Sequence, residues 1–334
     1  MRKLATIREV KDISPIEGAD RIEVLTIDGW KVVAQKGLHQ VGDKVVYCEI
    51  DSFLPIKPEF EFLRPTSFRT DAIGNEGFRL KTIKMRGQVS QGLVLPIRDL
   101  DVDLSDKAIG DDVTELLGII KWEGPIPAEL DGEVLGEFPS FIKKTDEERI
   151  QNYSDIWDEV KGLTYWCTEK LDGTSFTAYI KGDHFGVCGR NWEYKESDTN
   201  TLWKIARELN LEETLRSLGR DIAIQGEVIG ERIQKNLYKL RGQHLYVFNI
   251  FDIENYRYCT QNDVEILCQM HGLNQVPVKF AGPLEKDTIE AVLESASGPS
   301  ELNNQQEREG LVFRALEKDF SFKAISNKFL LKHE

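Results

Sequence analysis

The sequence predicts an α+β protein with a small N-terminal β-barrel and a larger domain of antiparallel sheets flanked by helices. Over the first hundred residues, short runs of β-branched and apolar residues alternate with turn signals, and no helical pattern separates them. After residue 160, strand-like runs and helical patterns arrive irregularly, which favours antiparallel pairing over a doubly wound sheet. A chain of 334 residues is long enough for two such domains.

Turn signals divide the N-terminal barrel, which we expect to span residues 1–105. Asp28-Gly29 joins two strand-like runs as a hairpin, and Val41-Gly42-Asp43 is a turn that leads into another run. The polar and aromatic stretch 57–77 is expected to be a long inserted loop. The expected strands are Leu4–Val10, Arg21–Ile27, Trp30–Ala34, Lys44–Ile50, Phe78–Met85 and Gly92–Ile97.

Short strands without intervening helices are typical of an OB-type barrel, which holds nucleic-acid strands on one face and in its loops. Lys81, Lys84 and Arg86 are therefore candidate contacts to phosphate. For any one of them, a solvated strand face is an equally good interpretation. The net charge of −14 opposes nucleic-acid binding in general, so a basic surface on this chain has to be local.

A linker is expected over residues 106–137, because Gly124-Pro125-Ile126-Pro127 interrupts any regular pattern. The second domain then spans residues 138–334. Its expected strands are Tyr165–Lys170, Ser175–Ile180, Phe185–Cys188, Ile222–Val228, His244–Ile253, Gly310–Ala315 and Phe320–Ile325. Helical spacing of apolar residues predicts helices over Thr201–Leu209, Asp263–Met270 and Asp287–Ala296.

A further short helix is expected to begin at Thr145. Thr145 has the character of an N-cap, and Glu148 completes a capping box three residues later. Arg149 and Gln151 on this helix are candidates to face a ligand, although such residues more often belong to the surface.

Composition limits the functions that this chain can have. No uninterrupted apolar run approaches the length of a membrane span, and the first residues lack the apolar stretch of a secretion signal. Five cysteines without close pairing argue against a disulfide framework or a zinc site. We expect a reducing, cytoplasmic location and no membrane partner, and no obligate protein partner is evident.

Lys170 stands in the run Glu169-Lys170-Leu171-Asp172-Gly173-Thr174-Ser175, directly after an apolar segment. A lysine amine attacks a nucleotide phosphate at neutral pH only if burial or a cationic neighbour lowers its pKa, and a strand would bury its stem. Asp172 is expected on the same strand face, and Gly173 allows a close backbone approach. Lys-x-Asp-Gly is weak by itself, because a surface hairpin turn explains it as well.

Single charged residues recur in later apolar strands. Glu227 lies between two glycines, Glu309 precedes an apolar run, and Lys323 interrupts another. Burying such charges is costly unless they are paired. We therefore expect a mutually neutralising cluster. Its members are Lys170, Asp172, Glu227, Glu309 and Lys323.

Six motifs, in this order, resemble the nucleotidyltransferase motifs that DNA ligases, RNA ligases and mRNA capping enzymes share. They are Glu169–Ser175, Gly189-Arg190-Asn191, Gly226–Gly230, Tyr246–Ile250, Glu309–Phe313 and Phe322-Lys323. The chain most resembles ATP-dependent RNA ligases that carry an N-terminal OB module, and the resemblance covers nearly its whole length. It implies an OB-fold domain followed by a nucleotidyltransferase, or ligase adenylylation, domain.

The resemblance also implies roles in binding ATP. Lys170 would accept AMP, and Phe248 would stack on the purine. Lys323 would neutralise the α-phosphate, and Arg190 would contact the nucleotide or the incoming 5′ phosphate. The implied ATP-binding residues are Glu169, Lys170, Leu171, Arg190, Glu227, Phe248 and Lys323.

The same resemblance implies a divalent cation, Mg²⁺ or Mn²⁺, and a nucleic-acid substrate. Asp172, Glu227 and Glu309 would hold the cation, partly through water, and Glu227 would alternatively contact the ribose. Ser175 and Arg190 would contact nucleic acid together with the basic residues of the barrel.

The implied activity is ATP-dependent sealing of 3′-OH and 5′-phosphate ends, as in nick repair, through a lysyl-AMP and an adenylylated 5′ end. The partner would be RNA or a nicked duplex that contains RNA. Two positions depart from the family pattern. Ile325 stands where a second lysine is expected, which leaves Lys328 or Lys332 to substitute, and Ser175 stands where DNA ligases have arginine.

Two other functions fit parts of the sequence. A GTP-dependent capping-type guanylyltransferase shares the lysine chemistry, but its OB module usually follows the catalytic domain. A non-catalytic RNA-binding protein with a degenerate ligase domain would explain Ile325, but it would not explain the intact Lys170, Glu227 and Glu309.

Overall fold

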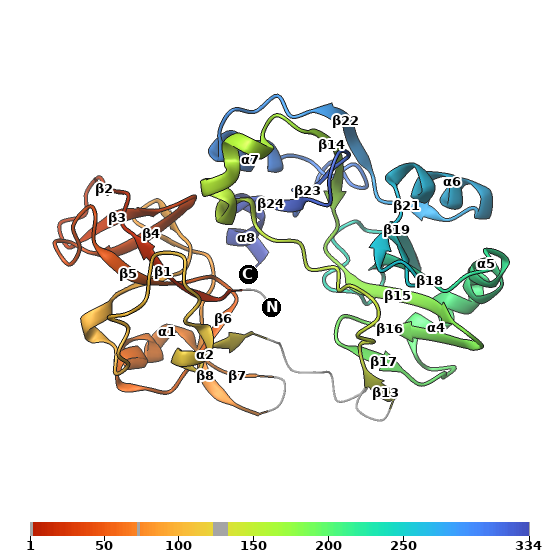
Figure 1. The fold of residues 1–334 in the computed structure, drawn as a ribbon, viewed down its shortest axis with the longest axis horizontal. Coiled ribbons are helices and arrows are strands. Elements are labelled where there is room, and N and C mark those ends of the chain that lie inside the picture. Colours follow the sequence, from red (N-terminus) through yellow and green to blue (C-terminus); the bar gives the residue numbers. More distant parts are fainter. Residues whose placement is uncertain (1–2, 72–73, 123–132, 334) are drawn as a thin grey trace.

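A computed structural model of the chain describes residues 3–71, 74–122 and 133–333. Figure 1 shows an N-terminal β domain beside a larger α+β domain, with the C-terminal helix α8 (Asn327–His333) between them. In the described residues, no helix is long and apolar enough to cross a membrane. The linker motif at residues 124–127 lies outside the described residues.

Short antiparallel strands form the N-terminal domain around two apolar clusters. One sheet has the order β1 (Ala5–Glu9), β5 (Lys44–Cys48), β11 (Leu93–Pro96), and a second has the order β2 (Asp12–Pro15), β3 (Ile22–Ile27), β4 (Trp30–Gln35). A third has the order β12 (Ile120–Lys121), β6 (Ser52–Pro55), β8 (Glu76–Arg79), β7 (Phe68–Thr70). The Asp28-Gly29 turn joins β3 to β4, as the sequence predicts.

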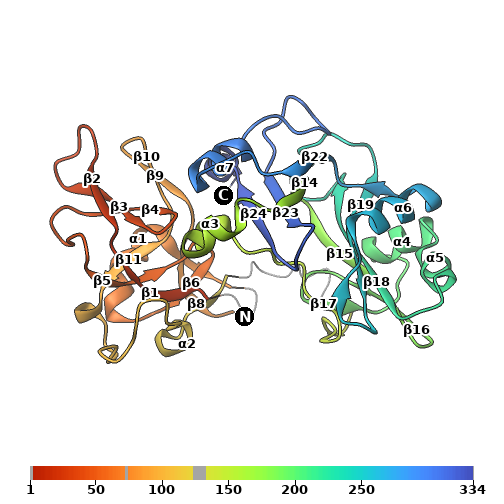
Figure 2. The same cartoon turned by 45° about the horizontal axis from the view of Figure 1, so that its top comes forward.

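Two expectations for this domain are wrong. Residues 57–77 are not a plain loop, because η1 (Pro58–Leu63), α1 (Arg64–Ser67) and β7 form there around the fully buried Phe60. The single strand expected at 78–85 is broken between β8 and β9 (Ile83–Met85), where the buried Leu80 bonds back to Ser52 and Asp51. Strand β9 then pairs with β10 (Gln88–Ser90) as a separate hairpin, which Figure 2 shows projecting from the domain.

The second domain contains two sheets. The larger one has the order β13 (Val134–Glu137), β17 (Trp192–Tyr194), β16 (His184–Cys188), β15 (Thr174–Lys181), β18 (Ile222–Gly230), β19 (Gln243–Asp252), β20 (Arg257–Tyr258), and β21 (Asn274–Gln275) also pairs with β19. The smaller one has the order β22 (Val278–Pro283), β14 (Thr164–Lys170), β23 (Gly310–Ala315), β24 (Ser321–Ile325). All expected strands of this domain form, with ends shifted by one or two residues.

Helices cover one face of each sheet (Figure 1). Apolar residues of α4 (Thr201–Glu208), α5 (Leu211–Ser217) and α6 (Gln261–His271) pack on the larger sheet in one cluster. Residues of α3 (Trp157–Val160) and α7 (Ile289–Ala296) pack on the smaller sheet in another. On the opposite face of the larger sheet, Phe138, Phe141 and Ile142 pack in a further apolar cluster with Tyr179 and Phe251.

The helix expected at Thr145 does not form. Residues 143–148 have no regular secondary structure, and the first helical turn is η4 (Ile150–Ile156). The carboxylates here bond to distant groups instead of capping a helix. Asp146 pairs with Arg190, and Glu147 pairs with Arg314 on β23.

Element η4 also joins the two domains. The indole Nε1 of Trp30 donates to Asn152 Oδ1 over 2.7 Å, and Asn152 Nδ2 donates to Glu49 over 2.8 Å. A Cβ on Gly29 would overlap the backbone of Gln151, so only glycine lets the β3–β4 turn approach so closely. The N-terminal domain is thus held against the segment that leads into β14.

Candidate active site

A cavity of about 920 Å³ lies where the two sheets of the second domain meet the N-terminal domain. Strand β14 belongs to the smaller sheet and β15 to the larger one, so the Leu171–Gly173 segment crosses from one sheet to the other. The hairpin interpretation of Asp172-Gly173 is therefore wrong. A Cβ on Gly173 would overlap the Val228 carbonyl of β18, which confirms the close backbone approach.

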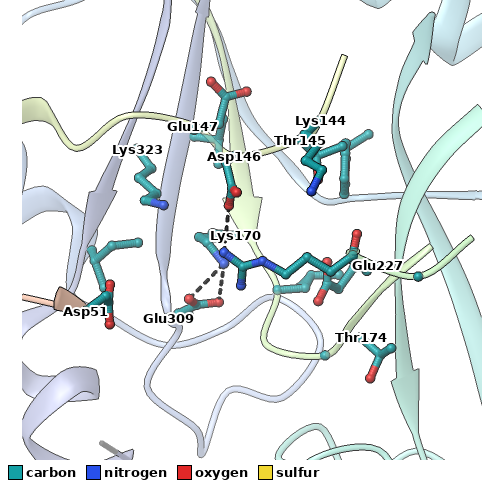
Figure 3. A pocket seen from close by; sticks show the side chains of 18 of the residues that line it. Asp51, Lys144, Thr145, Asp146, Glu147, Lys170, Thr174, Glu227, Glu309 and Lys323 are labelled. Carbon is teal, nitrogen blue, oxygen red and sulfur yellow. Dashed lines mark hydrogen bonds and ion pairs between the residues drawn. The ribbon is translucent and has the colours of Figure 1, made fainter. Parts of the chain in front are cut away.

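Lys170 ends β14 and lines this cavity. Its partner in the adjacent strand is Gly310, which brings the preceding Glu309 next to it. The Lys170 Nζ lies 2.8 Å from both carboxylate oxygens of Glu309 (Figure 3). The register of two strands therefore fixes this ion pair.

Glu227 faces the cavity from β18 in the larger sheet, opposite Ser175 of β15. Figure 3 shows Lys170 between Glu309 and Glu227, with Lys323 pointing in from β24. These four residues, Lys170, Glu227, Glu309 and Lys323, line the cavity and are called the pocket floor below. Asp172 does not line it, although its charge acts on the pKa of both Lys170 and Glu227.

The pKa of Lys170 is raised, which differs from the expectation that its surroundings lower it. Burial lowers the pKa of this amine, but the charges of Glu309 and Glu227 outweigh burial. The lysine is therefore held as an ammonium in the ligand-free site. A nucleophilic amine requires that these carboxylates be neutralised by another positive charge.

Burial and mutual repulsion disfavour the ionised forms of the carboxylates around Lys170, and the lysine only partly offsets this effect. Burial is the main reason that the pKa of Glu227 rises to about 8, with Lys170 opposing the rise and Glu309 adding to it. Burial and the charge of Glu309 raise the pKa of Asp172 to about 6. A cation is therefore favoured here on electrostatic grounds.

The donor set of the pocket floor fits Mg²⁺ or Mn²⁺, because hard divalent cations prefer carboxylate and water oxygens. In the described part of the chain, no three His, Cys, Asp or Glu side chains form a group that could hold a metal ion by themselves. That Asp172, Glu227 and Glu309 hold the cation partly through water stays a prediction.

The rim of the cavity carries a second set of ion pairs. Arg190 Nη2 lies 2.8 Å from Asp146 Oδ1, and Lys121 Nζ lies 2.9 Å from Asp146 Oδ2. Burial would raise the pKa of Asp146, but Arg190 and Lys121 hold it below its usual range. The Arg190 side chain is about half exposed, so it is accessible to a ligand.

The other predicted ATP-site residues also line the cavity. Glu169 and Leu171 flank Lys170, and Phe248 enters from β19, where a bulge places one extra residue opposite β18. Ser175 lines it as well, beside Glu227. The structure thus brings together all the predicted ATP-site residues.

Three predicted phosphate contacts lie elsewhere. Lys81, Lys84 and Arg86 do not line the cavity; Lys84 and Arg86 are exposed on the β9–β10 hairpin. Lys328 and Lys332, considered as substitutes for the second lysine of the last motif, lie on α8 and do not line it either, whereas the buried Ile325 does. Neither lysine therefore takes that place in this structure.

Sequence reasoning missed the contribution of the N-terminal domain. Asp51, Asp71, Arg79, Lys121 and Trp122 line the cavity and are called the N-terminal wall below. It also missed Asp146, although it singled out Arg149, which lines the cavity with only 5% of its side chain exposed. The acidic run 146–148, directly before Arg149, was the available signal.

Family models and solved structures place this architecture among known proteins. Residues 4–97 match an OB-fold domain family, and residues 163–325 match the RNA ligase family. No curated protein matches the sequence. Together with the lysine pocket, these matches define a ligase-type nucleotidyltransferase preceded by an OB-fold domain.

Solved structures of a Naegleria gruberi RNA ligase are similar over the whole chain. The form with PPi is 48% identical, covers 100% of this chain and 99% of its own, and has a TM-score of 0.92. A variant with AMP and Mn is 48% identical with a TM-score of 0.92, and another with ATP and Mn is 47% identical with a TM-score of 0.91; each covers 99% of both chains. The chain belongs to the RNA ligase family. It is an ATP-dependent RNA ligase.

Proposed function

We propose that this RNA ligase seals nicks in duplexes that contain RNA, joining a 3′ hydroxyl to a 5′ phosphate. The observation that carries the proposal is the Lys170–Glu309 pair at the junction of two sheets, inside a cavity that both domains line. Because the OB-fold domain forms one side of the cavity, both domains can contact a duplex on the two sides of its nick.

The pocket offers complementary groups for adenine. Glu169 is 1% exposed, and its Oε2 accepts from the Glu301 amide over 2.8 Å. Its Oε1 is a buried acceptor without a hydrogen-bond partner among the described residues. Such an acceptor suits an exocyclic amino group, which adenine has at the position where guanine has an oxygen. Phe248 supplies an apolar ring for stacking.

Cationic groups line the expected path of the phosphates. Arg149 Nη2 lies 3.4 Å from Asp51, but its Nε and Nη1 are buried without partners in the described chain. Lys323 extends toward Lys170 from β24 (Figure 3). These donors suit a triphosphate, whose transferred group gains negative charge during the reaction.

Three transfers would follow. The Lys170 Nζ, after losing its proton, forms a bond to the α-phosphorus of ATP while the bond to pyrophosphate breaks. An oxygen of the RNA 5′ phosphate then takes the AMP from lysine. Finally the 3′ hydroxyl oxygen attacks the RNA 5′ phosphorus, its proton is lost, and AMP leaves. The divalent cation supplies charge neutralisation beside Glu309 and Glu227.

The proposal is tested by replacing the nucleophile. Lys170→Ala is expected to abolish label transfer from α-labelled ATP to the protein, whereas Lys204→Ala, an exposed lysine on α4, leaves it intact. With ATP and a matched nicked duplex, Lys170→Ala should not seal. It should retain sealing when the 5′ end already carries AMP. Persistent labelling of Lys170→Ala would contradict the assignment.

We also propose a reducing, cytoplasm-like compartment and no obligate protein partner. The five cysteines are free, and four of them are buried.

Ribose preference at the 3′-hydroxyl end of the nick, measured with matched ribose and deoxyribose duplexes, tests the RNA character of the junction.

A further inference from the structure

The loop between β18 and β19, residues 231–242, is basic in an otherwise acidic protein. Residues 231–241 contain four basic residues and one acidic residue, Glu231, while the whole chain has a net charge of −14. The four are Arg232, Lys235, Lys239 and Arg241, and all are exposed. None of them forms an ion pair within the described residues, so their charges are available to a polyanion.

This loop has a fixed shape next to the nucleophile. Gln234 lines the cavity and donates to the Gly173 carbonyl over 3.1 Å. The buried Tyr238 accepts through its hydroxyl from the Asp172 amide over 2.7 Å. The loop therefore continues the active site outward from the turn that follows Lys170.

Backbone strain is concentrated in the same loop. Nine described non-glycine residues have a positive φ, and four of these lie within eight residues of the β18–β19 loop. They are Arg232, Gln234, Asn236 and Lys239. Left-handed backbone in such residues is costly, and it tends to persist where a defined surface is needed for function.

The end of α8 extends the basic surface. Lys239 Nζ lies 3.4 Å from Gln305 Oε1, and the adjacent Gln306 Nε2 lies 3.2 Å from His333 Nε2. The pKa of His333 is lowered, chiefly by burial, and the charges of Lys332 and Lys235 lower it further. These contacts place the end of α8 beside the loop, and the exposed Lys332 directly precedes His333 in α8. Lys332, which does not line the cavity, therefore lies beside the basic loop.

We propose that Arg232, Lys235, Lys239, Arg241 and Lys332, here called the junction patch, bind the sugar-phosphate backbone of the RNA strand that carries the activated 5′ phosphate. The inference rests on the proposed nick-sealing function. It adds a binding surface that is separate from the ATP pocket and from the β9–β10 hairpin. The strand leaving the cavity past Gln234 would run directly over these cations.

The test neutralises three lysines together, K235Q/K239Q/K332Q. A matched control, K204Q/K286Q/K318Q, removes three exposed lysines that have no ion pair among the described residues. Binding is measured by fluorescence anisotropy over a range of KCl concentrations, without divalent cation, on a nicked RNA duplex whose 5′ end carries AMP. Thermal unfolding confirms that both variants are folded.

The patch variant is expected to bind at least about tenfold more weakly at low salt. The slope of log K against log[KCl] should fall by about two to three, since each neutralised phosphate contributes about 0.9. The control should keep the parent slope. K235R/K239R/K332R keeps the charges and should also keep the slope. If the triple glutamine variant does not fold, K235Q/K239Q takes its place and should lower the slope by about two.

Labelling of the protein by α-labelled ATP in the same preparations separates the two proposals. We expect the patch variant to label within about twofold of the parent, because the patch lies outside the floor. Equal salt slopes for patch and control variants would overturn the patch, as would labelling that falls as far as RNA binding. If the parent itself is not labelled, the lysyl-AMP function fails while the RNA-binding result stands on its own.

Discussion

The pocket floor and the N-terminal wall face the same cavity, but different interactions hold them. The floor is fixed by strand register and by a Lys170–Glu309 pair whose side chains are 28% and 16% exposed. The wall is held by a few hydrogen bonds across the domain junction, such as Trp30 to Asn152. Changes in the floor should therefore affect chemistry, whereas changes in the wall should affect how the domains are held.

The largest effect is expected at Lys323. Lys323→Ala should lower the rate of protein labelling by ATP about 10²–10³-fold, the loss typical of one donor to a developing negative charge. Lys318→Ala is the control, because this exposed lysine lies over the Phe320 ring in the same hairpin and does not line the cavity. A rate within tenfold of the parent would remove Lys323 from the floor's chemistry.

A smaller effect is expected at Glu309, and it should depend on the metal. Glu309→Gln should raise the Mn²⁺ concentration needed for half-maximal labelling about 10–100-fold, as for other groups that orient a metal through water. Glu317→Gln, which changes an exposed glutamate two residues after β23, should not change it. An unchanged Mn²⁺ requirement for Glu309→Gln would contradict its role in holding the cation.

At the rim, Asp146→Asn should change RNA adenylylation by only a few fold. The Asp146–Arg190 pair is about half exposed, and such pairs contribute roughly 0–1 kcal/mol to stability. Loss of the carboxylate releases both Arg190 and Lys121. Single-turnover transfer of AMP from the labelled protein to 5′-phosphorylated RNA measures the effect, and a loss comparable to that of Lys323→Ala would place Asp146 in the floor.

The smallest effect on chemistry is expected at the domain junction that holds the wall in place. Trp30→Phe removes the indole donor to Asn152 and should lower the free energy of unfolding by about 1 kcal/mol, with labelling within about twofold. Trp166→Phe is the control, because the Trp166 Nε1 has no hydrogen-bond partner in the described chain. Urea unfolding measures both. Equal stability losses would show that the Trp30 bond does not hold the domains.

The difference between the pocket floor and the N-terminal wall explains which parts of the site could be predicted from the sequence. The strands of the floor carry strong local patterns, so β14, β15, β18 and β23 form where expected. The wall depends on contacts between residues far apart in the chain, such as Arg149 and Asp51, which are 98 positions apart. No local pattern encodes such a pairing, and this is why the wall residues were missed.

The segment around Thr145 is a second example of structure that could not be predicted from the sequence. Its capping-box pattern is real, but Asp146 and Glu147 gain ion pairs with Arg190 and Arg314 that a helix would not allow. Tertiary pairing outweighed a weak local preference. The raised pKa of Lys170 was likewise missed, because it depends on the strand register that puts Glu309 beside the amine.

The proposed mechanism depends on one lysine that carries adenylate at the junction of two sheets. The most direct measurement is peptide mapping by tandem mass spectrometry after the protein is incubated with ATP and Mn²⁺ in the absence of RNA. We expect a single AMP adduct on the amine of Lys170, which disappears when RNA with a 5′ phosphate is added. An adduct on any other residue, or none in a folded protein, would contradict it.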